Sequence, residues 1–295
     1  MITLGDKGVE VSKLQKLLSF SGYDLVIDGI FGPKTFRSLK ALQKKYGLKV
    51  NGVADFKTNT ILKTAQKRTS KEVSEIRYGK NYNSLSIDSS IKLNSEQYIK
   101  QILDKDKIFI HHTCNGPSIN NAIKNLGSDY NTVSSAFIIS SEKGGKIYEL
   151  YNPNFWSFHL GAKGTNGKHD RSSIAVELCS WGQLTKKNGK YFSFNNIEIE
   201  ESDVQVLEDK WRGSFYYHKY SDEQITSLKN LLIWIIREYK IQIQNIKFDE
   251  NWLNYNDELV KHGTQGIWSH SSMRKDVQDL YPDQRLFEVL NNIKL

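Results

Sequence analysis

Two stretches within the first 65 residues place hydrophobic side chains at helical spacing. Residues three and four positions apart share one face of a helix, so each stretch predicts a short amphipathic helix. Pro33 stands near the start of the second stretch, a position that suits proline. A third short helix is expected after the next glycine-marked loop. The two hydrophobic stripes consist of Val11, Leu14, Leu17 and Leu18, and of Phe36, Leu39, Leu42 and Tyr46.

The loops beside these helices form a short internal repeat. The first loop, Asp28–Pro33, contains two glycines that can adopt positive φ, and Thr35 follows it. The second loop, Asn51–Asp55, also has a glycine after its first residue, and Thr58 follows it in the same way. Each unit is a glycine turn followed by a threonine at the start of a helix. The repeat predicts two related turns within one small domain.

From residue 95 onward, strand-like and helix-like segments alternate. The segment Glu142–Gly145 is typical of a hairpin turn between two apolar runs. A capping box at Ser221–Gln224 opens a long helix whose buried face would be Ile225, Leu228, Leu232, Ile235 and Tyr239. This order predicts an α/β fold, with a mixed central sheet flanked by helices and preceded by a small three-helix domain. Predicted strands cover residues 108–113, 133–140, 146–151, 172–179 and 245–248, and further helices cover 95–103 and 283–291.

Changes in composition along the chain predict its division into domains. Residues 66–94 are polar and lack periodic apolar positions, which is typical of a linker. We therefore expect a three-helix domain over residues 1–65, a linker over 66–94 and a larger domain over 95–295.

The overall composition is that of a folded protein, with 38% hydrophobic and 25% charged residues. No apolar stretch approaches the roughly 18 to 20 residues of a membrane span, so no membrane span is expected. The start of the chain shows neither the basic nor the apolar region of a signal peptide, which predicts synthesis in the cytoplasm. The two cysteines are too few for a disulfide framework. We expect a monomer.

Positive charge is concentrated at the N-terminus. The net charge is +8, and the first 65 residues hold 11 Lys and Arg against 5 Asp and Glu, a net charge of +6. A basic domain suits a polyanionic partner such as nucleic acid, a membrane surface or an anionic cell wall. No zinc-finger, RNP or homeodomain pattern supports nucleic acid as the partner. A solvated basic face is the alternative.

The candidate chemistry lies at the ends of two apolar runs. His111 and His112 end the run Ile108–Ile110, and His270 follows another apolar pair. An imidazole at the end of a buried strand is held rigidly, which suits a metal ligand. Two such histidines and one carboxylate from the acid-rich stretch Asp276–Asp279 would leave a fourth zinc position open for water.

The N-terminal 65 residues resemble the peptidoglycan-binding domain of bacterial and phage wall hydrolases. This resemblance implies wall binding, and we assign the contact to the first glycine loop, through Asp28, Phe31 and Thr35. Structural roles are the alternative for most of the matching residues. The matching residues include Gly5, Gly8, Val11, Leu14, Gln15, Gly22, Asp28–Gly32, Thr35, Leu42, Gln43, Gly47, Leu48, Asn51, Gly52 and Thr58.

The larger domain is similar to zinc-dependent N-acetylmuramoyl-L-alanine amidases of the bacteriophage-lysozyme and peptidoglycan-recognition type. The resemblance covers roughly residues 105–290. Within this range, residues 183–220 form an insertion relative to the family pattern. It implies peptidoglycan as the substrate, and we expect no nucleic-acid partner and no membrane span. The matching segments are Ile108–Thr113, Ser134–Ile139, Phe158–Gly161, Ser173–Leu178 and Gly266–His270.

The same resemblance implies a role for each site residue. His111 and His270 match the two zinc histidines, and Asp279 fits the third ligand better by spacing than Asp276. Glu177 matches the family's general base, and His159 matches a histidine that lines the cleft and contacts substrate. His112 should point away from His111, since neighbouring residues of a strand face opposite sides.

Two positions depart from the family pattern. A lysine often precedes the third ligand by two residues, but Val277 stands there, and Ser135 replaces a tyrosine found in some relatives. We therefore expect Lys275 or His159 to assist the metal in stabilising the oxyanion.

The resemblance implies cleavage of the amide bond between N-acetylmuramic acid and L-alanine, by water that Zn2+ and Glu177 activate. The domain order suits a phage endolysin that reaches the periplasmic wall after release through a pore and lyses the host. A non-catalytic peptidoglycan receptor is the main alternative, and a nucleic-acid-binding protein that relies on the basic N-terminal domain is a weaker one.

Overall fold

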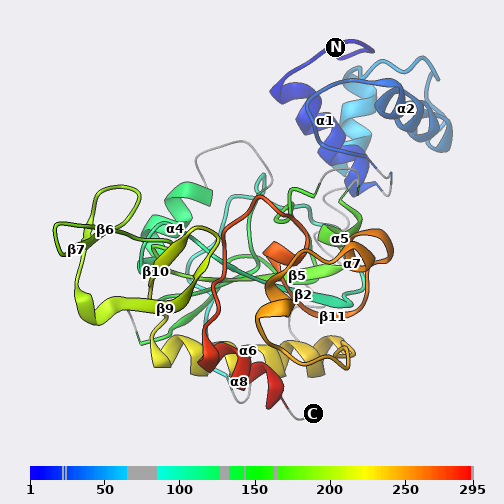
Figure 1. Cartoon of the computed structure of the whole chain (residues 1–295). Helices are drawn as coiled ribbons and strands as arrows, with labels where there is room; N and C mark the ends of the chain where they lie inside the picture. The colour runs from blue at the N-terminus through cyan, green and yellow to red at the C-terminus, as the bar shows by residue number, and fades with distance from the viewer. Residues whose placement is uncertain are drawn as a thin grey trace. The chain divides into compact units, whose positions relative to one another are not determined.

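The computed structural model describes residues 1–21, 23, 25–64, 85–126, 133–142, 144–162, 165 and 167–293. The chain folds as two compact units, one containing the N-terminal helices and one containing the central sheet. Figure 1 shows both units, and each is described by itself.

The N-terminal unit contains the predicted helices. Helix α1 spans Val9–Phe20, helix α2 spans Pro33–Lys45, and residues 56–64 are helical. Pro33 begins α2, where its missing N–H costs no helical hydrogen bond. The predicted stripes face a common core in which Leu14, Leu18, Leu39 and Leu42 are at most 1% exposed, except that Tyr46 follows the end of α2 and is 40% exposed.

Each glycine turn of this unit is organised by a buried glutamine. The Oε1 atom of Gln15 accepts a hydrogen bond from the Gly29 N–H at 2.9 Å. Its Nε2 amide lies 2.8 Å from Asp28 Oδ1 and 3.2 Å from Thr35 Oγ1. Gln43 repeats the pattern in the second turn, with partners Asn51, Gly52, Val53 and Thr58. The internal repeat predicted from the sequence is therefore confirmed, and its function in the structure is to fix the turns.

The second unit is built on a six-stranded mixed sheet with strand order β1-β4-β3-β5-β2-β11. Neighbouring strands β3, β5, β2 and β11 run parallel, whereas β3 and β4 form the predicted antiparallel hairpin. The predicted mixed α/β class is thus confirmed. The strands are β1 (Ile87–Asp88), β2 (Lys107–His112), β3 (Phe137–Ile139), β4 (Ile147–Glu149), β5 (Ser173–Leu178) and β11 (Gly266–Ser269).

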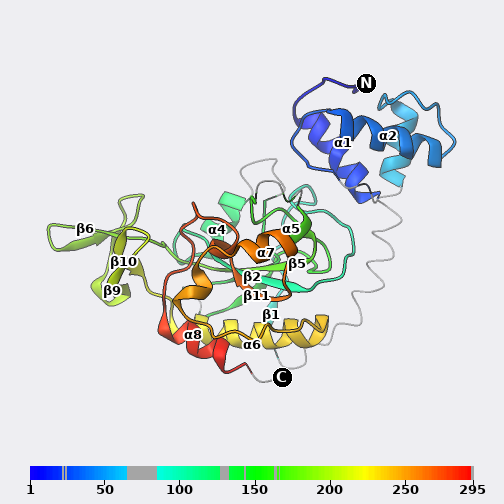
Figure 2. The same cartoon turned by 45° about the vertical axis from the view of Figure 1, so that its right-hand side comes forward.

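Helices lie on both faces of this sheet. Helices α6 and α8 cover one face, and α5 and α7 lie on the opposite side (Figures 1 and 2). The predicted capping box begins α6, and the Gln224 Nε2 amide donates to the carbonyl oxygens of Ile139 and Cys179, which ties the helix to the sheet. The helices are α4 (Ile119–Leu126), α5 (Lys168–Arg171), α6 (Asp222–Tyr239), α7 (Asp257–His262) and α8 (Gln284–Asn291), with 3-10 turns η1 (Glu201–Asp203), η2 (Glu250–Leu253) and η3 (His270–Ser272).

Three local predictions differ from the structure. Residues 95–103 form a turn and extended chain where a helix was predicted. No strand forms at 245–248, because the backbone N–H and C=O of Phe248 pair with the side-chain amide of Asn291. Strand β1 pairs with β4 inside the predicted linker, so the sheet includes residues 87–88. The rest of that linker, residues 66–84, and its boundary at residue 65 lie outside the described residues.

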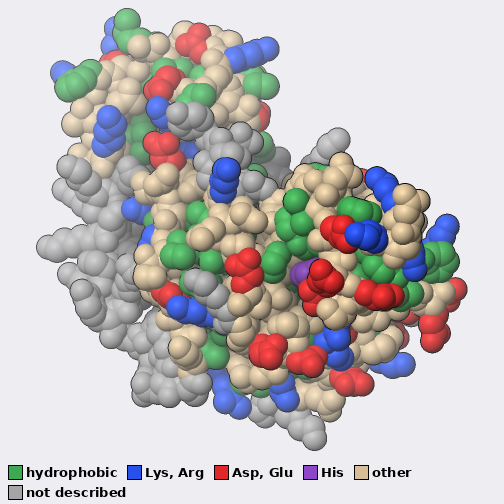
Figure 3. All heavy atoms as spheres, turned by 90° about the vertical axis from the view of Figure 1, so that its left-hand side faces the viewer, with side chains coloured by type: hydrophobic (Ala, Val, Ile, Leu, Met, Phe, Trp, Pro, Cys, Tyr) green, Lys and Arg blue, Asp and Glu red, His purple; other side chains and the backbone are tan. Residues whose placement is uncertain are grey.

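The predicted insertion at 183–220 folds into two small sheets. Strands β6 (Thr185–Lys187), β7 (Lys190–Phe192) and β8 (Glu198–Ile199) form one, around a small core of Leu184, Tyr191 and Ile199. Strands β9 (Val204–Trp211) and β10 (Ser214–His218) form a separate hairpin. Basic and acidic side chains are interspersed on the face of the molecule seen in Figure 3. No single sign of charge dominates that face.

Candidate active site

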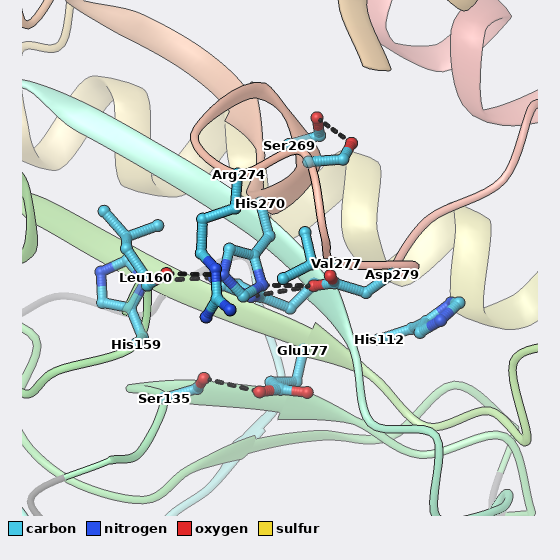
Figure 4. A network of polar contacts seen from close by, with 12 residues as sticks. His112, Ser135, His159, Leu160, Glu177, Ser269, His270, Arg274, Val277 and Asp279 are labelled. Carbon is cyan, nitrogen blue, oxygen red and sulfur yellow. Dashed lines mark hydrogen bonds and ion pairs between the residues drawn. The ribbon is translucent and has the colours of Figure 1, made fainter. Parts of the chain in front are cut away.

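The candidate site lies at the carboxyl ends of three neighbouring parallel strands. His111 on β2 pairs in register with Glu177 on β5, so both side chains leave the sheet on the same side. Ser269 pairs with Ile110 on the other side of β2, and His270 follows it directly. The sheet therefore places His270, His111 and Glu177 side by side (Figure 4).

Asp279 completes the cluster from an irregular segment that follows η3. Its Oδ2 atom lies 3.1 Å from His111 Nδ1 and 2.9 Å from His270 Nδ1. One ligand atom from each residue lies within 4.8 Å of the others, and among the described residues this is the group suited to hold a metal ion. The exposed fractions of His111 and Asp279 are only 3% and 8%.

Hydrogen bonds on the far side of each imidazole fix its protonation. The His270 Nε2 atom lies 2.9 Å from the carbonyl oxygen of Leu160, which can only accept. His270 therefore carries its proton on Nε2 in the neutral form, and its Nδ1 lone pair points toward Asp279.

The same tautomer of His111, with the proton on Nε2, is fixed by a longer chain of hydrogen bonds. Its Nε2 atom lies 3.1 Å from His159 Nδ1, and His159 Nε2 lies 2.8 Å from the Ser173 hydroxyl. The hydroxyl in turn donates to the carbonyl oxygen of Asp170 at 3.4 Å. Because the chain ends on a carbonyl, each link donates in one direction, and the His111 Nδ1 atom is left as an acceptor.

Three acceptors thus converge on one point: two imidazole nitrogens and one carboxylate oxygen. Three lone pairs of this kind repel one another unless a cation lies between them. Burial opposes charge on both groups, but the Asp279 carboxylate raises the pKa of His270, and His270 with His111 holds the pKa of Asp279 well below its usual value, so a positive charge is stabilised at this point. The donor set of two nitrogens and one oxygen fits zinc, for which histidine and aspartate are ordinary ligands.

The alternative third ligand, Asp276, is placed elsewhere. Its carboxylate pairs with Arg274, at 2.9 Å from Nε and 2.6 Å from Nη2, and its side chain is 69% exposed. The geometry therefore favours Asp279 over Asp276.

Glu177 lies beside the three converging groups without joining them. Its Oε1 atom accepts a hydrogen bond from the Ser135 hydroxyl at 3.0 Å. Burial raises its pKa, His111 opposes the rise, and the carboxylate of Asp279 adds to it. A carboxylate with a raised pKa next to a metal site is suited to accept and return a proton.

Comparison with known proteins agrees with this arrangement. The family model for N-acetylmuramoyl-L-alanine amidases matches residues 103–279, which is more than half of the chain. This chain belongs to the N-acetylmuramoyl-L-alanine amidase family. A second model, for peptidoglycan-binding domains, matches residues 7–62.

Individual relatives are similar to this amidase-family protein either over a short segment or at low sequence identity. The spore cortex-lytic enzyme of Bacillus cereus is 40% identical over 68 residues, and the match covers 23% of this chain and 26% of the relative. A mutant of PlyL has 12% identity and a TM-score of 0.40, with 70% of this chain and 99% of that chain covered. The amidase LysC from Clostridium intestinale URNW has 13% identity and a TM-score of 0.37, with 72% and 100% covered. Because these likenesses are partial or weak, family membership rests on the family model.

The two remaining histidines of the predicted site have structural partners. His112 points away from the cluster, as predicted, and its Nδ1 atom lies 2.8 Å from the Tyr220 hydroxyl. Both ring nitrogens of His159 are engaged, by His111 and by Ser173. Burial, together with His111, lowers the pKa of His159 well below its usual value, so this ring is neutral. Substrate contact by His159 stays a prediction, and the geometry gives it a role in orienting His111.

The predicted catalytic role of Lys275 is not supported by its position in the amidase domain. Its ammonium lies 4.7 Å from the ring centroid of Tyr255, and the residue is exposed. Arg274 lies closer to the site: a Cβ atom at Gly161 would stand only 2.5 Å from its Nη1 atom. Figure 4 shows the Arg274 guanidinium beside His270 and Leu160. The cation next to the site is therefore Arg274.

Two of the three predicted wall-contact residues are buried. Phe31 is 1% exposed and belongs to the core, and Thr35 is 3% exposed and bonds to Gln15. Their prediction as contact residues is therefore wrong in this conformation, because their side chains face inward. Asp28 is exposed, although its Oδ1 atom also fixes the turn.

Sequence reasoning did not assign a role to Ser173, which ends the chain of hydrogen bonds behind His111. Ser173 stands 62 positions from His111, and its hydroxyl is one of many in the chain. No local pattern indicates the link, because it arises only when His159 packs between Ser173 and His111.

Proposed function

We propose that this protein is a zinc-dependent peptidoglycan hydrolase that cleaves the amide bond between N-acetylmuramic acid and the L-alanine of the stem peptide. The observation that carries the proposal is the convergence of His111 Nδ1, His270 Nδ1 and Asp279 Oδ2, with Glu177 in register beside them. Membership of the amidase family supports the same reaction.

The metal site supports a hydrolytic reaction. A zinc ion held by His111, His270 and Asp279 would activate water near neutral pH and polarise the amide carbonyl as a Lewis acid. The hydrogen bonds that His270 and His111 make through Nε2 would leave both Nδ1 lone pairs available to such an ion, as a ligand requires.

Glu177 is the general acid and base in this proposal. It takes a proton from the attacking water and returns it to the departing alanine amine. Ser135 holds one carboxylate oxygen, which fixes the direction of the other. Arg274, beside Leu160, supplies a positive charge that can stabilise anionic oxygen atoms near the metal, in place of the predicted Lys275.

The N-terminal domain retains the protein on its substrate in this proposal. Its match to peptidoglycan-binding domains and its net charge of +6 over residues 1–65 support contact with an anionic wall. Among the described residues, no helix combines the length and hydrophobicity that a membrane span needs. We propose a phage endolysin that acts on the host wall as a monomer.

Digestion of purified peptidoglycan tests the proposal. The zinc-loaded, the chelated and the zinc-restored protein are compared, and soluble products are identified by mass. We expect free stem peptides that begin at L-alanine, lost on chelation and restored by zinc. Sacculi that bind the protein and stay intact under all three conditions would instead indicate a receptor without catalysis. Release of glycan fragments with the stem peptides still attached would exclude an amidase.

A further inference from the structure

The β9–β10 hairpin, residues 204–218, has no part in the reaction proposed above. Its two strands are joined by Arg212 and Gly213, whose φ values are 45° and 93°. A two-residue turn with both φ values positive matches the right-handed twist of a hairpin. Positive φ is unfavourable for arginine, so the turn holds Arg212 in a conformation that this residue rarely adopts.

The tip of this hairpin binds the segment that carries Asp279. The Arg212 Nη1 atom donates to the carbonyl oxygen of Lys275 at 2.9 Å and to that of Val277. The Trp211 indole N–H donates to the carbonyl oxygen of Leu280 at 3.1 Å. Residues 275–281, which we call the ligand segment, contain no helix or strand. These carbonyls therefore find their partners in the hairpin.

The base of the hairpin holds the far end of the same segment. The ring of Tyr281 stacks between Tyr217, at a centroid distance of 4.9 Å, and Tyr220, at 4.7 Å. The Tyr220 backbone N–H also donates to the Tyr281 hydroxyl at 3.2 Å. All three rings are fully buried. Contacts at 275, 277, 280 and 281 thus lie on both sides of Asp279.

The backbone beside the ligand is strained. Leu280, the residue after Asp279, has a φ of 64°, in the left-handed region that is unfavourable for a non-glycine residue. Such a conformation persists only where the surroundings impose it. The Trp211 bond to the Leu280 carbonyl and the stacked Tyr281 ring impose it here.

We propose that the β9–β10 hairpin positions Asp279 for metal binding, with Arg212 and Trp211 as the positioning residues. His111 and His270 are fixed by the central sheet, whereas Asp279 is fixed by the hairpin. The metal affinity is then set in part by a hairpin outside that sheet. This inference rests on the proposed metal site.

Co2+ titration followed by visible absorption tests the metal part of the inference. We expect Arg212→Ala to weaken Co2+ binding about 10–100-fold, the range for residues that orient metal ligands, and to change the spectrum of the bound ion. Arg212→Lys should recover part of the affinity, because an ammonium can still donate to the carbonyls. Trp211→Phe keeps the ring and should weaken binding less. Lys210→Ala, an exposed neighbour, is the control and should leave affinity and spectrum unchanged.

Hydrogen exchange of the metal-free, full-length protein tests the positioning by itself. Arg212→Ala should speed exchange in residues 275–281 while leaving β2 and β5 protected. Unchanged affinity and unchanged exchange in both Arg212→Ala and Trp211→Phe would overturn the inference. A wild-type protein that binds no Co2+ or zinc would instead overturn the proposed function, and the exchange result would still decide whether the hairpin orders the segment.

Discussion

Two regions of this molecule bury polar side chains, and they do so in opposite ways. In the N-terminal turns, Gln15 and Gln43 each place an amide among unlike partners, so that donors meet acceptors. At the strand ends of the larger domain, three acceptors face one another. The first arrangement is complete without any other molecule, whereas the second is suited to hold a metal ion. A buried polar cluster is therefore better judged by whether its donors and acceptors match than by its residue types.

The largest expected effect is the loss of turnover on substitution of Glu177. This substitution tests proton transfer separately from metal binding in the larger domain. Glu177→Gln keeps the shape and the Ser135 contact but cannot accept a proton. We expect turnover of purified peptidoglycan to fall about 10²–10⁴-fold. Zinc content, measured by atomic absorption, should remain that of the wild type. Near-normal rates would remove Glu177 from the role of general base.

The next largest effect concerns zinc affinity and tests whether Asp279 or Asp276 is the third ligand. Asp279→Ala should weaken zinc binding by more than the roughly 10–100-fold loss that follows removal of a residue behind a ligand. Asp276→Ala, its matched control, removes an exposed partner of Arg274 and should leave zinc binding intact. Competition with a chromophoric chelator measures both. The reverse result would assign the third ligand to Asp276.

A smaller loss of zinc affinity is expected when the hydrogen-bond chain behind His111 is broken. His159→Phe removes the acceptor of the His111 Nε2 proton, so the His111 tautomer is no longer fixed. We expect zinc affinity to fall about 10–100-fold. Ser173→Ala breaks the chain one step further on and should cost less in the same chelator assay. Equal affinities in His159→Phe and wild type would show that the chain does not orient His111.

The smallest expected effect concerns the matched cluster of the N-terminal turns. Gln43→Ala leaves the N–H groups of Asn51 and Gly52 without their acceptor and should cost about 1–3 kcal/mol of local stability. Hydrogen exchange of the full-length protein at residues 51–53 measures this. Lys44→Ala, an exposed neighbour on the same helix, is the control. Zinc affinity should not change in either variant, because this cluster serves the turn alone.

The sequence was most informative where chemistry coincides with strand ends. His111, Glu177 and His270 each follow an apolar run, and parallel strands bring such ends to one edge of a sheet. Asp279 was assigned as the third ligand from the spacing after the second histidine that the family resemblance implies. The strand-end pattern did not predict the sheet order, because it does not state which strands become neighbours.

The sequence failed where the direction of a side chain depends on distant contacts. Lys275 and Arg274 are adjacent, and only the packing of Tyr255 and Gly161 decides which of them lies beside the site. Phe31 lies in a loop, where no periodicity separates inward from outward positions, and Thr35 lies in the first turn of α2, on the same buried face as Leu39 and Leu42. The contacts of Arg212 with Lys275 and Val277 join residues more than 60 positions apart, beyond any local pattern.

The tandem histidines also have a consequence for how β2 folds. All six residues of β2 are buried, so alternation of apolar and polar positions does not specify its register. A slip of one residue would exchange the faces of His111 and His112 and separate each from its partner, His159 on one side and Tyr220 on the other. His159 and Tyr220 therefore favour the correct register of β2, because a misaligned strand loses both buried hydrogen bonds at once.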